Sequence, residues 1–122
     1  MSLQTEYEFT LPKGYVDSGG TLHRKGTMRL ATARDEIEPL RDKRVIDNEA
    51  YLTVIILARV ITRLGTVSNI SVKTIEDLFA ADLAYLQDLY GIINFGDPEV
   101  LKSLESERPL AEARVEELIG ES

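Results

Sequence analysis

Apolar and polar residues alternate at the start of the chain, in the segment TEYEFTL at residues 5–11. Tyr7, Phe9 and Leu11 fall on one side of an extended backbone, and acidic or hydroxyl residues fall on the other. This period of two is typical of a strand with one buried face. Pro12 is expected to end the strand, because its nitrogen carries no hydrogen that could bond to a neighbouring strand.

The residues after this strand have the composition of a hairpin turn and a return strand. The turn, KGYVDSGGT, contains Asp and Ser, which bond to nearby backbone, and Gly residues that accept positive φ. The return strand is LHRKGTMRLA, with Leu22, Met28 and Leu30 as its inward side chains. Gly26 is expected to mark a bulge or a second turn. Because one hairpin is only marginally stable alone, its apolar face should pack on helices.

The apolar spacing changes to steps of three and four in the rest of the chain, which predicts helices. A short helix should begin at Thr32, with Asp35 three residues later completing a capping box. Asp35 also suits the positive end of the helix dipole. Pro39 should stop or kink this helix, because a proline ring clashes with the preceding turn.

The longest predicted helix begins at Asp47 or Asn48 and ends at Gly65. Part of it, LTVIIL, is rich in β-branched residues and is also compatible with a strand. We favour the helix because apolar residues recur at four-residue steps across the whole segment. These residues are Leu52, Ile56, Val60 and Leu64.

A further helix should begin near Ser71 and break at Phe79–Ala80, and a longer helix should follow as far as Gly96. In the stretch DLFAADLAYLQDLYGIIN, apolar residues exceed what one stripe of a helix needs. The surplus is either a surface for a partner or for self-association, or the mark of a helix packed on two sides inside its own domain. The candidate partner-binding residues are Phe79, Tyr85, Leu89, Tyr90, Ile92 and Phe95.

The last part of the chain differs in composition. Asp97 and Pro98 form a strong helix start, and the segment 97–122 holds eight acidic and three basic residues. We therefore expect two parts. Residues 1–96 should form a single α+β domain, with an N-terminal β-hairpin packed on a bundle of four to five α-helices. Residues 97–122 should form an acidic helical C-terminal arm.

Composition narrows the class of protein. The 122 residues include no Cys and one His, which excludes disulfides and thiolate metal sites and disfavours zinc. A chain with a net charge of −7 lacks the basic surface of a nucleic-acid-binding protein. The start of the chain does not resemble a signal peptide, and its most apolar run is far too short to span a bilayer. We expect a cytoplasmic protein with neither a membrane nor a nucleic-acid partner.

Residues suited to catalysis do not form a recognisable set. His23 stands on a predicted strand without an identifiable partner, so a structural role is favoured over that of a general base. Asp82 and Asp88 are six residues apart and do not share a helix face, which makes them a poor acid–base pair. Ser18 lacks the nucleophile-elbow pattern and a nearby His. No catalytic, cofactor-binding or metal-binding residue is assigned, and no cofactor is expected.

Three patterns of residue type stand out once the elements are ordered. One enters the short helix from the return strand, one lies in the long helix, and one lies in the last helix. They comprise Met28, Arg29, Leu30, Thr32 and Asp35; Leu57, Ala58, Val60, Ile61 and Leu64; and Leu78, Asp82, Leu83, Tyr85, Leu86, Gln87 and Tyr90. Across about residues 5–95, this order resembles the small tail assembly chaperones (E/41/14-like) of tailed phages and phage-tail-like contractile injection systems.

The resemblance implies a non-enzymatic function. Proteins of this family coat the tape-measure protein, keep it soluble and help to deliver tail tube subunits. Such a chaperone needs apolar grooves or stripes for helical segments of its client, and an acidic surface keeps the complex soluble. The alternative is a structural tail component, such as a tube-terminus cap or a baseplate adaptor. A small enzyme that uses His23 is disfavoured.

Overall fold

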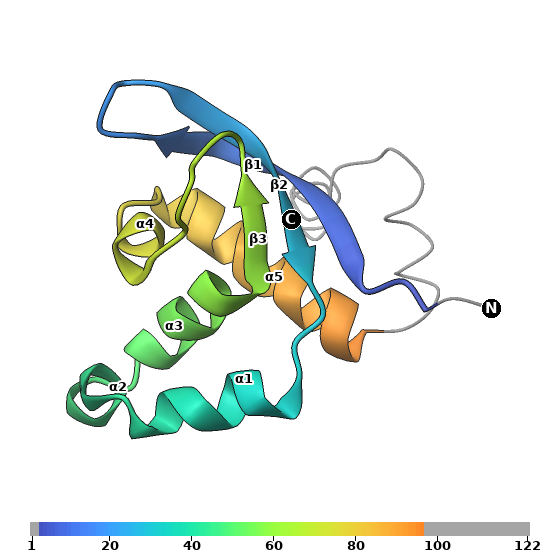
Figure 1. Ribbon diagram of the computed structural model, residues 1–122, viewed down its shortest axis with the longest axis vertical. Helices are drawn as coiled ribbons and strands as arrows, with labels where there is room; N and C mark the ends of the chain where they lie inside the picture. Colours follow the sequence, from blue (N-terminus) through green and yellow to red (C-terminus); the bar gives the residue numbers. More distant parts are fainter. Residues whose placement is uncertain (1–2, 97–122) are drawn as a thin grey trace, which may run out of the picture.

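Three strands form one antiparallel sheet in the order β1–β2–β3 (Figure 1). β1 (Glu6–Val16) and β2 (Leu22–Arg29) are the expected hairpin, and β3 (Ile61–Leu64) pairs with the other edge of β2. The structure is a computed structural model, and it describes residues 3–96. Strands and helices both contribute to the described chain, so the predicted α+β class is confirmed.

Helices make up most of the remaining described chain. Their bounds are α1 (Ala33–Ile37), the 3-10 helix η1 (Glu38–Arg41), α2 (Lys43–Asp47), α3 (Tyr51–Val60), α4 (Val72–Glu76) and α5 (Ala80–Phe95). In Figure 1, α5 crosses behind the sheet, and it contacts both β1 and α3. The run of short helices from α1 to α2 lies at the end of the molecule away from the hairpin turn.

β1 continues through Pro12, so the prediction that this residue ends the strand was wrong. The pairing of β1 with β2 shifts register between Thr10 and Tyr15, where four residues of β1 lie opposite one residue of β2. A bulge of this kind is one of the few places in a sheet that accept a proline. Gly14, at a φ of 112°, supplies backbone geometry that other residues rarely adopt.

The carboxylate of Asp82, near the start of α5, binds this bulge. The backbone N–H of Lys13 donates to one carboxylate oxygen at 2.8 Å, and that of Gly14 donates to the other at 2.9 Å. Asp82 is fully buried, so the charged group depends on these bonds in place of water. One turn later, the ring of Tyr85 meets that of Phe9 edge to face, with 6.5 Å between their centroids. A charge-assisted pair of hydrogen bonds and an aromatic contact therefore fix α5 to β1.

The longest predicted helix is shorter than expected at both ends. α3 begins at Tyr51, not at Asp47 or Asn48, and it ends at Val60 instead of Gly65. The next four residues form β3, whose first and last side chains are buried and whose middle two are exposed. The β-branched residues at this junction favour extended backbone. Pairing with β2 also satisfies backbone groups that an open sheet edge would leave unpaired.

Two expectations for β2 also need correction. Leu22 is exposed and does not point inward, whereas the neighbouring His23 is buried. Gly26 forms neither a bulge nor a turn, because it pairs in register with residues of both neighbouring strands. A Cβ at Gly26 would collide with the Phe9 ring and with the carbonyl of Arg63. The missing side chain therefore lets the three strands meet.

Several local predictions are confirmed. α1 begins after Thr32, whose backbone N–H donates to the Asp35 carboxylate at 2.8 Å, as in a capping box. Pro39 diverts the chain from α1 into η1. The break at Phe79 separates α4 from α5, and Gly96 is the C-cap of α5.

The hydrophobic core lies between the sheet and the helices. Phe9 and Leu11 of β1 are buried, as the alternating pattern predicts, and so is Met28 of β2. Leu57 of α3 and Leu86 of α5 belong to the same buried cluster. The acidic helical arm predicted for 97–122 lies outside the described residues.

Replacing Asp82 by Asn should lower the free energy of unfolding by about 2–4 kcal/mol, because an amide keeps one acceptor and turns an N–H donor toward the bulge. Urea denaturation at neutral pH measures this loss. The matched control is Asp77→Asn, which removes an exposed carboxylate that lies 3.3 Å from the Lys73 ammonium. That change should cost less than about 0.5 kcal/mol. Equal losses in the two variants would contradict the role assigned to Asp82.

Candidate functional site: an apolar groove between α3 and α5

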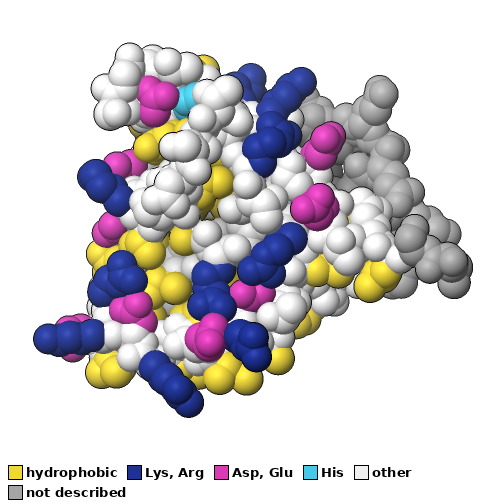
Figure 2. All heavy atoms as spheres, in the orientation of Figure 1, with side chains coloured by type: hydrophobic (Ala, Val, Ile, Leu, Met, Phe, Trp, Pro, Cys, Tyr) yellow, Lys and Arg dark blue, Asp and Glu magenta, His cyan; other side chains and the backbone are white. Residues whose placement is uncertain are grey.

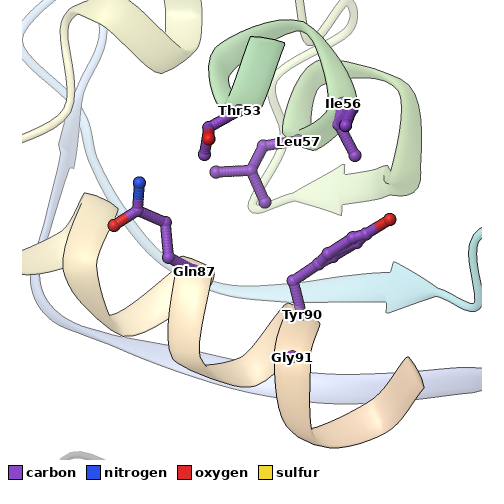
Figure 3. A pocket seen from close by; sticks show the side chains of 6 residues that line it. All are labelled: Thr53, Ile56, Leu57, Gln87, Tyr90 and Gly91. Atoms are coloured by element: carbon purple, nitrogen blue, oxygen red, sulfur yellow. The ribbon is translucent and has the colours of Figure 1, made fainter. Parts of the chain in front are cut away.

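A groove of about 240 Å³ opens between α3 and α5 (Figure 3). In Figure 3, the side chains of Leu57 and Tyr90 face each other across it, and Gln87 lies on the side of Thr53. The groove is lined by Thr53, Ile56 and Leu57 from α3 and by Gln87, Tyr90 and Gly91 from α5.

The groove exists because α3 and α5 each turn one row of side chains toward the other, and the row of α5 includes Gly91, which has no side chain. The lining residues of each helix stand at positions i, i+3 and i+4, which share a face. At Gly91, a Cβ would meet no other atom within 4 Å. A glycine inside a helix costs about 1 kcal/mol relative to alanine, and here it leaves open space beside α3.

Tyr90 forms a fixed wall of the groove. Its hydroxyl donates to a carboxylate oxygen of Glu36 in α1 at 3.1 Å, and its ring meets that of Phe95 edge to face at 6.2 Å. Burial, together with the nearby Glu36 carboxylate, raises the pKa of Tyr90 to about 12. The phenol therefore stays protonated and keeps its hydrogen bond at neutral pH.

A buried carboxylate holds α1 against the sheet and α3. Arg29 of β2 donates two hydrogen bonds to Asp35, at 2.7 and 3.0 Å, and Arg59 of α3 donates a third at 3.0 Å. Arg59 also donates to Glu38 at 2.6 Å. The Arg29 guanidinium, more than any other group, holds the pKa of Asp35 well below its usual range. The network fixes the position of α1, which carries the partner of Tyr90.

The structure divides the six residues that were expected to bind a partner. Three of them are buried, namely Tyr85, Leu89 and Tyr90. Ile92 is half-buried, and Phe79 and Phe95 are exposed. The three buried residues belong to the core, because α5 packs on both β1 and α3. The interpretation of a helix packed on two sides is therefore correct for them. Phe79 and Phe95 stand at opposite ends of α5 and do not form one surface.

Most residues that line the groove were not predicted as site residues. Ile56 and Leu57 are inconspicuous in a strongly apolar segment, and Thr53 and Gln87 carry no special chemistry. Gly91 was a usable signal, because it lies well inside a predicted helix and has no turn or cap to form.

His23 has a partner that was not identified from the sequence. Its Nε2 lies 2.8 Å from a carboxylate oxygen of Asp17, and its Nδ1 accepts from the N–H of Thr66 at 3.3 Å. Because Nδ1 accepts, Nε2 carries the hydrogen and donates to Asp17. The other Asp17 oxygen accepts from the N–H groups of Gly19 and Thr21, each at 2.9 Å. Both ring nitrogens are engaged, so His23 joins the hairpin turn to the loop after β3.

Among residues 3–96, no group of three or more His, Asp or Glu side chains is placed to hold a metal ion. Within the same range, no helix has both the length and the apolar character needed to cross a membrane. No protein-family model matches the chain, and neither a curated protein nor a solved structure matches it.

Asp35→Asn should lower the free energy of unfolding at pH 7 by about 3 kcal/mol, because two guanidinium groups lose their shared carboxylate. The pKa of Asp35 is lower in the folded state than the value of about 3.9 expected in the unfolded chain. Its contribution to stability is therefore present above about pH 4 and is lost as the pH falls toward the folded pKa. Wild type should lose more stability than the variant between about pH 5 and pH 2.5.

Urea denaturation at several pH values measures both effects. The control Asp47→Asn removes an exposed carboxylate of α2 and should follow wild type across the pH range. The interpretation is wrong if wild type and Asp35→Asn lose the same stability on acidification.

Proposed function

We propose that the chain is a non-enzymatic assembly chaperone of a phage tail or tail-like particle, which binds the tape-measure protein and aids tube assembly. The observation that carries this proposal is the groove between α3 and α5. Its walls are largely aliphatic and aromatic, and the polar side chains among them, Thr53, Gln87 and Tyr90, are uncharged. A helical client can insert apolar side chains into such a groove at steps of three or four residues.

The size of the groove favours a protein client over a small molecule. Its volume of about 240 Å³ exceeds the roughly 150 Å³ of a protein cavity that takes up benzene, so an aromatic or branched side chain fits. Sites for cofactors and drug-sized ligands usually enclose about 300–1,000 Å³. A groove of intermediate size is suited to side chains that belong to a larger partner.

The resemblance to tail assembly chaperones supports this particular kind of client. The polar residues of its first pattern are Arg29, Thr32 and Asp35, and both Arg29 and the backbone N–H of Thr32 donate to the Asp35 carboxylate. That carboxylate also binds Arg59, and so holds together the elements around the groove. The pattern therefore has a structural reason in this chain, and it supports the assignment to the chaperone class.

The chemistry of the titratable groups supports binding and not catalysis. Both carboxylate oxygens of Asp82 accept hydrogen bonds from backbone N–H groups of β1. His23 uses both ring nitrogens within the fold. A general acid or base needs an atom free to exchange a proton with a substrate, and neither residue offers one.

Filling the groove tests the proposal. Gly91→Leu should place a side chain between α3 and α5, where a Cβ meets no other atom within 4 Å. Binding to the tape-measure protein of the same phage or tail-like element should weaken at least about tenfold, or 1.4 kcal/mol. Isothermal titration calorimetry with a purified tape-measure fragment measures this change, and circular dichroism verifies the fold.

Gly91→Ala is the matched control, because a methyl group leaves most of the groove open. It should bind like wild type and gain about 0.5–1 kcal/mol in stability from its higher helix propensity. Unchanged binding by a folded Gly91→Leu protein would overturn the groove as the client site. Presence of the chain at fixed stoichiometry in purified particles would instead favour a structural tail component.

A further inference from the structure

The hydrogen bonds of His23 leave no place for a second proton on its ring. The side chain is buried, and its two nitrogens have opposite roles, since Nε2–H donates to Asp17 and Nδ1 accepts from the N–H of Thr66. In Figure 2, the one histidine of the chain (cyan) lies at the end of the molecule that carries the hairpin turn, with an acidic side chain (magenta) beside it. A proton on Nδ1 would face the hydrogen of Thr66, so the bond between them would be lost.

Asp17 keeps the first ring hydrogen on Nε2. One of its carboxylate oxygens lies 2.8 Å from Nε2, and the other accepts from the N–H groups of Gly19 and Thr21 at 2.9 Å. The hydrogen bond with His23, more than any other interaction, lowers the pKa of Asp17. The carboxylate therefore remains an acceptor in mild acid, and a second ring proton has only Nδ1 to occupy.

The groups packed around Nδ1 offer the second proton no acceptor. Tyr15 of β1 stacks on the ring, with 6.3 Å between the centroids. The backbone of Gly65 lies so close that a Cβ there would collide with Nδ1. Residues 65–70 contain no ionisable side chain, and Arg24 lies on the opposite face of β2 because side chains alternate along a strand.

The charges on the same face of the sheet do not favour a second positive charge on the ring. Lys25 lies on this face, two residues or about 7 Å along β2. Thr27, two residues further, stands between Glu8 of β1 and Arg63 of β3. That position is about 13 Å from the ring, beyond the Debye length of about 10 Å at 0.1 M salt. The nearest of these three charges is therefore a cation, which opposes protonation while the loop is in place.

The bond to Nδ1 ties the loop after β3 to the hairpin. Among residues 3–96, no other hydrogen bond joins residues 66–69 to the hairpin. Gly65 is held separately, because its N–H donates to the carbonyl of Lys25 at 2.7 Å, and its φ of 55° turns the chain away from β3. Loss of the Thr66 bond would therefore free the loop beyond Gly65 and leave the pairing of β3 intact.

We propose that His23 is an acid-sensitive switch, in which a proton bound at Nδ1 releases residues 66–69 from the hairpin. The proton comes from solvent once the Thr66 bond opens, and it then prevents that bond from closing again. Histidine is the side chain that ordinarily changes charge between about pH 5 and 8, and the chain contains one. This inference goes beyond the proposed function, because the groove between α3 and α5 takes no part in it.

Amide hydrogen exchange of the full chain, followed by NMR between pH 8 and pH 5, tests the proposal. Once the ring titrates, the ratio of open to closed forms should rise about tenfold for each further unit of decreasing pH. The protection of the Thr66 amide, corrected for the intrinsic exchange rate, should therefore fall at least about tenfold. The nitrogen-15 shifts of the ring report protonation of Nδ1, and the buried Leu86 of α5 should keep its protection.

Two variants of the same residue separate the acceptor from the proton. His23→Asn places an amide oxygen near the position of Nδ1 and takes up no proton, so Thr66 should stay protected at both pH values. His23→Gln extends an amide nitrogen toward Asp17 but leaves Thr66 without an acceptor, so its protection should be low at both. Circular dichroism verifies the folds, and the wild-type exchange profile with the ring shifts decides the question if a variant does not fold.

Three outcomes would overturn the proposal. Undiminished protection of Thr66 at pH 5 would mean that the bond survives acid. A pH dependence that persists in folded His23→Asn would assign the effect to another group. An equal loss of protection at Leu86 would mean that acid unfolds the chain as a whole and does not release the loop.

Discussion

The rest of the described structure depends on the two hydrogen bonds that the Asp82 carboxylate accepts from the bulge of β1. A buried charge needs several bonds to offset its loss of water, and the two backbone N–H groups of the bulge need an acceptor. The bulge supplies hydrogen-bond donors to the carboxylate, and the carboxylate supplies the acceptor that the bulge needs. The bulge admits Pro12 into the strand, and the carboxylate determines where α5 meets the sheet.

The position of α5 then determines what its other side presents. With Tyr85 against Phe9, the face that carries Gln87, Tyr90 and Gly91 is turned toward α3. A second buried carboxylate, Asp35, orders the elements beyond this face by binding Arg29 and Arg59. The groove therefore lies in a frame that two buried acids hold from opposite ends. Such charge-assisted frameworks keep a geometry more rigidly than aliphatic packing alone.

Local sequence signals predicted those features that depend on neighbouring residues. The alternation at Phe9 and Leu11, the capping box at Thr32 and the break at Phe79 require no knowledge of distant segments. Features that depend on distant partners were predicted wrongly or missed. Pro12 ends strands in general, but Asp82 lies 69 residues beyond Lys13 and stabilises an exception. The segment after Val60 fits a helical spacing, yet the open edge of β2 makes it a strand.

The candidate site shows the same division. The surplus of apolar residues on α5 was visible, but single-chain periodicity does not distinguish a second packing face from an open surface. Tyr85 proved to be core because β1 covers it. The groove forms only where α3 packs beside α5, and no local sequence pattern predicts that contact. Gly91, which has no role in a turn or a cap, was the only signal for the groove in the sequence.

The bulge in β1 also affects how molecules of this protein meet one another in solution. β1 is an edge of the described sheet and, at 11 residues, a long one. A regular edge of this length is a template on which another strand can add, which leads to aggregation. Here Pro12 removes a donor, the bulge bends the strand, and two of its N–H groups already point inward to Asp82. The interaction that orders the fold therefore also protects the chain against self-templated β-assembly.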